Sequence, residues 1–232
     1  MTPEEFRRLG HQIVDWVADY RERAASLPVM SRVAPGDIKS QLPASPPQAP
    51  EGFEAVLRDL DQVIVPGLSH WQHPRFFGYF PSNGELSSVL GDYLSTGLGV
   101  LGLSWQSSPA LTEVEEVVTD WMRQMVGLSD AWSGVIQDTA SSCTLVSLLC
   151  ARERASDFSL VRGGLQGEAS PLVVYVSAHS HSSVEKAALL AGFGRANIHV
   201  VPTDDRYAMR ADALGQAVRD DLAAGRRPCA VV

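Results

Sequence analysis

Apolar residues at helical spacing mark the first segment of the chain, residues 2–26. One helix face would carry the apolar side chains of Phe6, Leu9, Ile13, Trp16, Val17 and Tyr20. Thr2 and Glu5 have the spacing of a capping box, and Pro3 suits the first turn of a helix. The pattern predicts a long amphipathic helix whose apolar face needs a partner surface, either in its own domain or on another subunit.

The next segment, residues 27–52, loses this periodicity and is rich in proline. Its six prolines are Pro28, Pro35, Pro43, Pro46, Pro47 and Pro50. Proline removes a backbone donor and interrupts helices and central strands, so we expect an extended connector without regular helix. A short helix is expected over residues 52–65, closed by Pro66 and Gly67.

Aromatic residues then concentrate in residues 70–81, which read HWQHPRFFGYFP. The prolines and the glycine in this stretch favour a loop over a helix. Helical spacing returns over residues 85–100 and again from Pro109 to Gly127. Residues 1–107 are therefore predicted to form a helical arm, a connector and an aromatic loop.

Beyond Gly127, short apolar runs alternate with helical segments. Strands are expected at residues 132–137, 172–177, 198–201 and from 229 onward, and helices at 144–154, 182–191 and 211–224. This alternation predicts an α/β domain over residues 108–232, with a mostly parallel sheet and helices on both faces. The last three residues resemble the first part of a buried strand, so we expect a further segment to complete the domain.

Composition and charge narrow the class of protein. The chain is 45% hydrophobic and 20% charged, as in globular domains, and its net charge of -8 argues against a nucleic-acid or anionic-membrane partner. Charges throughout the first 20 residues argue against a signal peptide, and no apolar run is long enough to span a membrane. Three cysteines without a CxxC pair suit a reducing compartment, so a cytoplasmic protein is expected.

The first candidate for chemistry is the polar turn 138–142, between an expected strand and an expected helix. Free N–H groups and the positive dipole end of a helix start suit a phosphate, and Thr139, Ser141 and Ser142 add hydroxyl donors. An ordinary helix cap is the alternative, because Ser and Thr are common caps. The turn lacks both the GK[ST] of a P-loop and a GxGxxG, which favours a simple phosphorylated cofactor over a nucleotide.

The second candidate is the turn 179–183 after the strand expected at 172–177. Ligands bind at this edge of an open α/β sheet, so a histidine there faces the crevice. His179 and His181 could also be two legs of a metal site, but no nearby Cys, Asp or Glu completes a zinc set at the usual spacing, and no metal is expected. A surface or capping histidine is the remaining alternative.

The two turns together carry a family resemblance. GVIQDTASSCT, followed some forty residues later by HSSVEKA, resembles the group II pyridoxal-phosphate decarboxylases, and most closely the aromatic-L-amino-acid decarboxylases. HPRFFGYFP resembles that family's substrate loop, and SSPALTEVE resembles a further segment of it. The resemblance covers nearly the whole chain and implies the fold of type I pyridoxal-phosphate enzymes, preceded by a helical arm.

The resemblance implies pyridoxal 5'-phosphate (PLP) as the cofactor. Ala140 and Ser141 match the pair that holds its phosphate, and Thr139 lies beside them as a further expected cofactor contact. His181 matches the histidine that stacks on the pyridine ring near the substrate, so it is the expected catalytic residue. Asp138 replaces a residue that is usually small in the family. Because a carboxylate repels a phosphate, we expect its side chain to point away.

Contacts with an amino-acid substrate are implied for Trp71, Tyr79, Phe80, Pro81, Ser82 and Leu103. Leu103, expected to reach the site from the opposite subunit, stands where the family has an aromatic residue, so the exact substrate stays open. Packing of the loop is the alternative role for Trp71, Phe76 and Phe77. The resemblance also implies a homodimer in which the N-terminal arm is swapped between subunits.

PLP chemistry needs a lysine that binds the cofactor covalently and an acid at its pyridine nitrogen. The chain's two lysines, Lys39 and Lys186, do not match the family's lysine, so we expect both groups beyond Val232, in a C-terminal segment of the same protein. The expected reaction is decarboxylation of an aromatic L-amino acid to its arylalkylamine. An aldehyde synthase on the same fold and a non-catalytic fragment stay open, whereas the aromatic loop argues against a glutamate-type enzyme.

Overall fold

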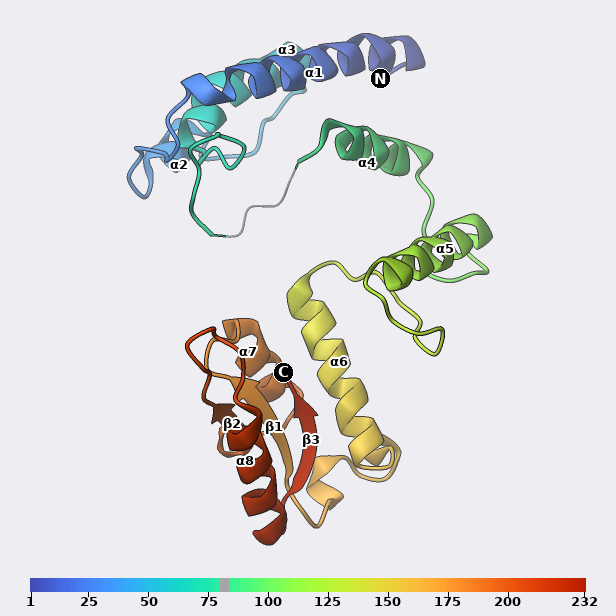
Figure 1. Cartoon of the computed structure of the whole chain (residues 1–232). Coiled ribbons are helices and arrows are strands. Elements are labelled where there is room, and N and C mark those ends of the chain that lie inside the picture. Colours follow the sequence, from blue (N-terminus) through green and yellow to red (C-terminus); the bar gives the residue numbers. More distant parts are fainter. Residues whose placement is uncertain (80–83) are drawn as a thin grey trace. The chain divides into compact units, whose positions relative to one another are not determined.

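The computed structural model describes residues 1–79 and 84–232 (Figure 1). Contacts within the chain divide it into two compact units, Met1–Val100 and Leu101–Val232. The boundary between the arm and the α/β domain, expected between residues 107 and 108, is not tested by this division and stays a prediction. No helix among the described residues has the length and apolar character that a membrane crossing requires.

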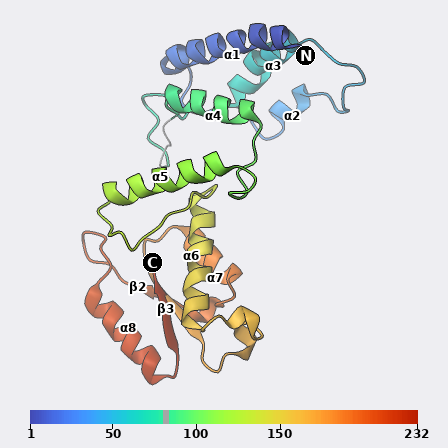
Figure 2. The same ribbon diagram turned by 90° about the vertical axis from the view of Figure 1, so that its right-hand side faces the viewer.

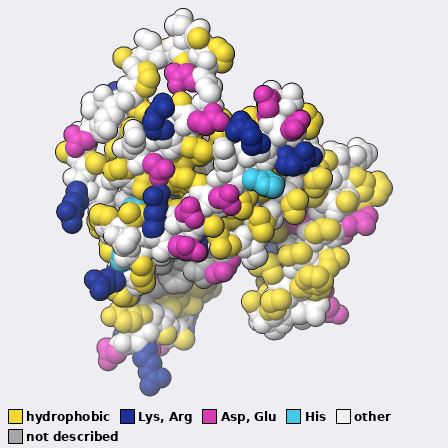
Figure 3. Space-filling model, turned by 90° about the horizontal axis from the view of Figure 1, so that it is seen from above, with side chains coloured by type: hydrophobic (Ala, Val, Ile, Leu, Met, Phe, Trp, Pro, Cys, Tyr) yellow, Lys and Arg dark blue, Asp and Glu magenta, His cyan; other side chains and the backbone are white. Residues whose placement is uncertain are grey.

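The first unit begins with the predicted amphipathic helix, α1 (Pro3–Arg23), followed by a 3-10 turn over Ala24–Ser26. The capping box is confirmed: the Thr2 hydroxyl accepts from the Glu5 N–H at 3.1 Å, and the Glu5 carboxylate accepts from the Thr2 N–H at 2.6 Å. Leu9 is buried, but Phe6 and Val14 are each 50% exposed. Figure 3 shows hydrophobic side chains interspersed with charged ones on one face of the molecule, and the exposed apolar residues of this unit also include Leu94 and Leu98.

The connector after α1 corrects one prediction. It contains a short helix, α2 (Asp37–Gln41), where no regular helix was expected. The chain turns into it through Gly36 at φ +102°, and the Asp37 carboxylate accepts from the Ala34 N–H at 2.7 Å. The stretch between Pro35 and Pro43 contains no proline, so one helical turn fits there despite the overall composition.

Two further helices complete the first unit. The expected helix over residues 52–65 is α3 (Phe53–Asp59), which continues into a wider π-type turn over Leu60–Ile64 and a 3-10 turn over Val65–Gly67. The Asp61 carboxylate ties this segment to α1, because it accepts from Trp16 at 3.2 Å and from Arg23 at 2.6 Å. The helix α4 (Leu86–Leu98) also matches its prediction.

The second unit contains the predicted parallel sheet. Its strands, in the spatial order β2-β1-β3, are β2 (Ile198–Val201), β1 (Leu172–Ser177) and β3 (Arg227–Val231). Both pairings with β1 are parallel. The helices of this unit are α5 (Pro109–Met125), α6 (Ala140–Ala155), α7 (Ser182–Leu190) and α8 (Ala211–Ala223).

Strand β1 is the centre of the sheet and is buried on both faces. Alternate side chains of a strand point to opposite faces, and here Leu172, Val174 and Val176 pack with residues of α6 and α7. Val173 and Tyr175 pack on the other face with residues of α8. Figure 2 shows α6 and α8 on opposite sides of the strands. The prediction of helices on both faces is therefore confirmed.

The prediction of a strand at residues 132–137 is wrong. This segment is extended but pairs with no strand among the described residues. The N–H of Ile136 instead donates to the Glu115 carboxylate of α5 at 2.7 Å. A strand exists only where a neighbour completes its backbone hydrogen bonds, and a side chain meets that need here.

A buried carboxylate joins α8 to the sheet. The Tyr175 hydroxyl donates to Asp221 Oδ2 at 2.8 Å, His199 Nδ1 lies 2.8 Å from the same oxygen, and Arg226 reaches Oδ1 at 2.9 Å. Asp221 is 3% exposed. Burial works against its ionisation, but the hydrogen bonds from Tyr175 and Arg226 outweigh it and lower its pKa. Burial and the Asp221 carboxylate together raise the pKa of Tyr175.

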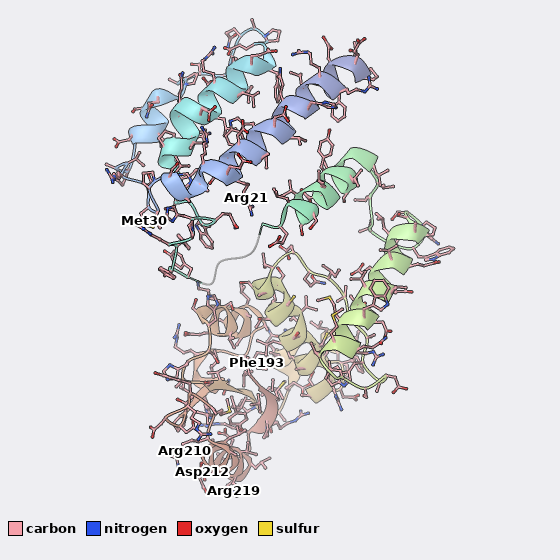
Figure 4. The ribbon with its side chains drawn as sticks, turned by 45° about the horizontal axis from the view of Figure 1, so that its top comes forward. Arg21, Met30, Phe193, Arg210, Asp212 and Arg219 are labelled. Atoms are coloured by element: carbon pink, nitrogen blue, oxygen red, sulfur yellow. The ribbon has the colours of Figure 1, made fainter. Side chains whose placement is uncertain are left out.

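Replacing this carboxylate should destabilise the chain. Asp221→Asn keeps the size of the side chain but removes the charge that accepts hydrogen bonds from Tyr175 and Arg226. Arg226 is 41% exposed, so we use the value for hydrogen bonds to a charged group, about 2 kcal/mol. We expect the free energy of unfolding, measured in urea, to fall by roughly that amount. The control is Asp212→Asn, which removes the exposed partner of Arg210 at the start of α8 (Figure 4) and should shift the midpoint far less than Asp221→Asn. Equal midpoints for both variants would show that the network does not stabilise the fold.

Candidate functional site

Helices α6 and α7 line a solvent-open cavity of about 280 Å³ in the second unit. Both sequence-predicted turns contribute to it, because Ser141 and His181 lie in its wall. The lining residues are Ser141, Ser142, Leu145, His181, Ser182, Ser183, Lys186, Ala187 and Leu190. The structure therefore brings together two candidate residues that are forty positions apart in the sequence.

The first wall is the start of α6. Thr139 is its N-cap: the Thr139 hydroxyl accepts from the Ser142 N–H at 3.2 Å and lies 3.1 Å from the Ser142 hydroxyl. The capping role considered from the sequence is thus confirmed for Thr139. Helix geometry leaves the N–H groups of Ala140 and Ser141 without an acceptor inside the helix. These two donors stay available to an anion at the helix start.

Asp138 corrects a prediction about this wall. Its side chain was expected to point away from the helix start, but the Ser142 hydroxyl in the first turn is the main cause that lowers the pKa of Asp138. Its own N–H and that of Thr139 contribute less, so the carboxylate lies near the helix start. The reason is local: an ionised carboxylate is itself favoured beside the unsatisfied donors of a helix start.

The second wall is the start of α7, where His181 is the N-cap. Its Nδ1 accepts from the Ser183 N–H at 3.2 Å and lies 2.9 Å from the Ser183 hydroxyl. A backbone N–H can only donate, so Nδ1 must be the acceptor and a neutral ring carries its proton on Nε2. The capping role is confirmed here as well. It leaves Nε2 as the ring nitrogen that can act on a ligand.

Lys186 is a cavity residue that the sequence analysis assigned no role. It follows Ser182 and Ser183 by four and three positions, so the three side chains share one face of α7. That helical spacing was the available signal. The cavity therefore combines a positive charge and hydroxyl groups, which suit an anionic group, with the apolar side chains of Leu145, Ala187 and Leu190.

The described residues that were expected to contact substrate are not part of the cavity lining and occur in both units of the chain. In the first unit, the Trp71 ring stacks on Tyr79 with centroids 5.6 Å apart and on Phe76 at 5.2 Å. Phe76 is buried, which fits loop packing, whereas Phe77 is 89% exposed. In the second unit, Leu103 is 80% exposed. Phe80, Pro81 and Ser82 lie outside the described residues.

The remaining candidates for chemistry are metal-ligating side chains and cysteine thiols. No group of three or more His, Cys, Asp or Glu side chains suited to a metal ion occurs in residues 1–79 and 84–232. The cysteines are all free thiols: Cys143 and Cys150 are exposed and Cys229 is half-buried. Burial raises the pKa of the Cys229 thiol, which makes it a weaker nucleophile.

Comparison with known proteins finds relatives that match all or nearly all of this chain. The aromatic-L-amino-acid decarboxylase of Bos taurus is 41% identical over 246 residues, covering 100% of this chain and 49% of that protein. The phenylacetaldehyde synthase of Arabidopsis thaliana is also 41% identical, over 236 residues that cover 98% of this chain and 47% of that protein. The chain thus spans about half the length of the curated relatives it matches.

Solved structures agree with these sequence relatives. The crystal structure of Catharanthus roseus tryptophan decarboxylase in complex with L-tryptophan superimposes with a TM-score of 0.92 and 35% identity, covering 100% of this chain and 50% of that one. The family profile described as the pyridoxal-dependent decarboxylase conserved domain matches residues 35–232. The family, the type I fold and the helical arm that the sequence motifs indicated are confirmed, and the chain belongs to the pyridoxal-dependent decarboxylase family.

Proposed function

We propose that this chain supplies half of the active site of a PLP-dependent carboxy-lyase that converts an aromatic L-amino acid to its arylalkylamine and CO2. The observation that carries the proposal is the cavity in which the start of α6, His181 and Lys186 come together. A volume of about 280 Å³ lies near the lower end of ligand pockets, and suits one end of a cofactor better than a cofactor with its substrate.

The donors at the start of α6 fit the phosphate of PLP. Ala140 and Ser141 would bind it through their N–H groups, and the Ser141 hydroxyl lies in the same wall. Thr139 would act indirectly, because its cap on Ser142 holds the first turn in place. PLP, when bound, supplies the electron sink that carbon–carbon cleavage at an amino acid requires.

His181 would orient the ring of the cofactor and the substrate beside it. Its Nδ1 is held by Ser183, so the imidazole plane is fixed relative to α7. Nε2 would then donate a hydrogen bond to the substrate or pass a proton to it. Neither Lys39 nor Lys186 is proposed as the covalent anchor of PLP. That lysine, with the acid for the pyridine nitrogen, is proposed to lie in the part of the family's length that this chain does not span.

Substrate contacts are proposed for Trp71, Tyr79, Phe80, Pro81, Ser82 and Leu103. Stacked rings at Trp71 and Tyr79 give a flat apolar surface of the kind that an aromatic side chain binds. Leu103 offers an exposed aliphatic side chain at its position, so the preferred aromatic amino acid is left to measurement.

An aldehyde synthase is the second candidate function. Its support is specific: the phenylacetaldehyde synthase relative is as similar to this chain as the decarboxylase relative, at 41% identity each. We further propose a cytoplasmic location, which suits three free cysteines.

The activity is tested on the full-length protein that contains this chain. Purified protein with PLP would be incubated with L-tryptophan, L-phenylalanine, L-tyrosine or L-DOPA. We expect CO2 and the corresponding amine in equal amounts, without oxygen consumption. Aldehyde formation with consumption of oxygen would identify the synthase instead. Absence of CO2 with all four substrates would contradict both functions.

The role of His181 can be separated from its role as a helix cap. Asparagine is a good N-cap, so His181→Asn should keep the stability of α7 while removing the imidazole. We expect kcat of the full-length protein to fall about 100-fold or more, with an unchanged midpoint of urea unfolding.

The matched variant is His181→Ala, which removes the ring and the cap together. It should lose the same activity and, in addition, about 1 kcal/mol of the free energy of unfolding. If His181→Asn were as active as the unaltered protein, the histidine would serve only as a cap.

A homodimer with a swapped arm is proposed from the exposed apolar face of α1. Val14 is 50% exposed on a helix whose apolar residues recur along one side. Val14→Glu should place a charge in the subunit interface and shift the full-length protein toward monomer at micromolar concentration, measured by analytical ultracentrifugation. Glu4→Gln, in the first turn of the same helix, is the control and should leave the dimer intact. A monomeric unaltered protein would contradict the proposal.

A further inference from the structure

A short hairpin loop follows β2 at the same edge of the sheet as the cavity. Thr203 and Met209 form an antiparallel bridge at its base. Inside the loop, Asp204 Oδ1 accepts from the N–H groups of Arg206 and Ala208, each at 2.9 Å. The N–H of Tyr207 donates to the Asp204 carbonyl at 3.0 Å. These bonds give the loop a single well-defined backbone.

This loop holds Tyr207 in a left-handed conformation, with φ +63°. Such a backbone is unfavourable for a bulky residue and persists only where surrounding contacts enforce it. Tyr207 is also 72% exposed, so burial of its ring does not offset the strain. Glycine would adopt the same backbone at lower free energy. The stability of the loop therefore does not explain a tyrosine at this position.

The ring of Tyr207 meets the loop that carries His181. Its centroid lies 5.1 Å from that of His179, and the two rings are nearly perpendicular at 80°. The loop from Ser177 to His181 is fixed on its other side, because the Ala178 N–H donates to the Val201 carbonyl at 3.1 Å. The Tyr207 ring thus packs against this loop at His179, while a backbone hydrogen bond to β2 holds the loop at Ala178.

Parallel strands β1 and β2 end at this edge, where ligands bind in open α/β sheets. We propose that Tyr207 is a positioning residue of the PLP site: by packing against His179, it fixes the loop that presents the His181 ring to the cofactor. The role rests on the proposed function above. Tyr207 acts through His179 and His181, and it is the ring, not the hydroxyl, that makes the contact.

The test uses the full-length protein with Tyr207→Gly, which releases the strain and removes the ring. PLP affinity is measured by titration of the apoprotein, and the bound cofactor is followed by its visible circular dichroism. We expect the Kd for PLP to rise roughly three- to tenfold and the dichroism to weaken, while the urea midpoint is unchanged or higher. Tyr207→Phe keeps the ring and should restore the unaltered values.

Phe158→Gly is the matched control. Phe158 is also non-glycine, left-handed (φ +61°) and 62% exposed, but it follows the far end of α6 from the cavity. The same substitution there should leave the Kd for PLP unchanged. His179→Ala should reproduce the effect of Tyr207→Gly, and the double variant should show no further loss, because both remove one contact.

The outcomes separate this inference from the proposed function. If the unaltered protein does not bind PLP, the proposed function fails, and the positioning role fails with it. If the unaltered protein binds PLP and Tyr207→Gly binds equally tightly, the positioning role alone is overturned. It is likewise overturned if Tyr207→Phe behaves as Tyr207→Gly, or if Phe158→Gly weakens PLP binding to the same extent.

Discussion

The burial of β1 on both faces is the constraint from which the site follows. Five of its six side chains are buried, with α6 and α7 on one face and α8 on the other. The chain leaves β1 at the carboxyl end of the strand, so the turn after Ser177 runs along that end of the sheet before α7 begins. Because α6 packs on the same face as α7, this turn places His181 beside the start of α6. The cavity is thus a consequence of core packing.

Most polar groups of the cavity come from the first turns of α6 and α7, and they determine which groups this chain can offer a ligand. Unsatisfied N–H groups, hydroxyls and the Lys186 ammonium group can attract and orient an anionic group. Nδ1 of His181 is hydrogen-bonded to the backbone of α7, which leaves Nε2 as the second ring nitrogen. Under the proposed function, this half of the family's fold would hold and orient the cofactor.

Local sequence signals predicted the parts of the fold that local interactions determine. The capping box of α1, the buried run of β1 and the start of α7 all read correctly, because each depends on neighbours within a few residues. The strand at 132–137 was wrong, since a strand needs a pairing partner that no local pattern encodes. The short helix α2 was missed for a related reason: proline content describes a whole segment, whereas one helical turn needs only five residues between prolines.

Within the site, the two turns were identified from residue type, but their geometry was not. Nothing in the sequence marks Tyr207 as left-handed, because that conformation usually signals glycine, asparagine or aspartate. The direction of Asp138 was inferred from repulsion of a ligand. In the structure, the groups that act on its carboxylate are the Ser142 hydroxyl and nearby N–H groups. Side-chain directions at a helix start depend on competition among several acceptors, and sequence spacing does not rank them.

The position of Asp138 changes how ligand binding at this helix start should be understood. The Asp138 carboxylate lies near the Ser142 hydroxyl and the Thr139 N–H, which lower its pKa. Under the proposed function, a phosphate bound to the N–H groups of Ala140 and Ser141 would have this negative charge as a close neighbour. A neutral side chain at position 138 would not repel the phosphate. The residue at position 138 would therefore help to set the affinity for the cofactor without donating to it.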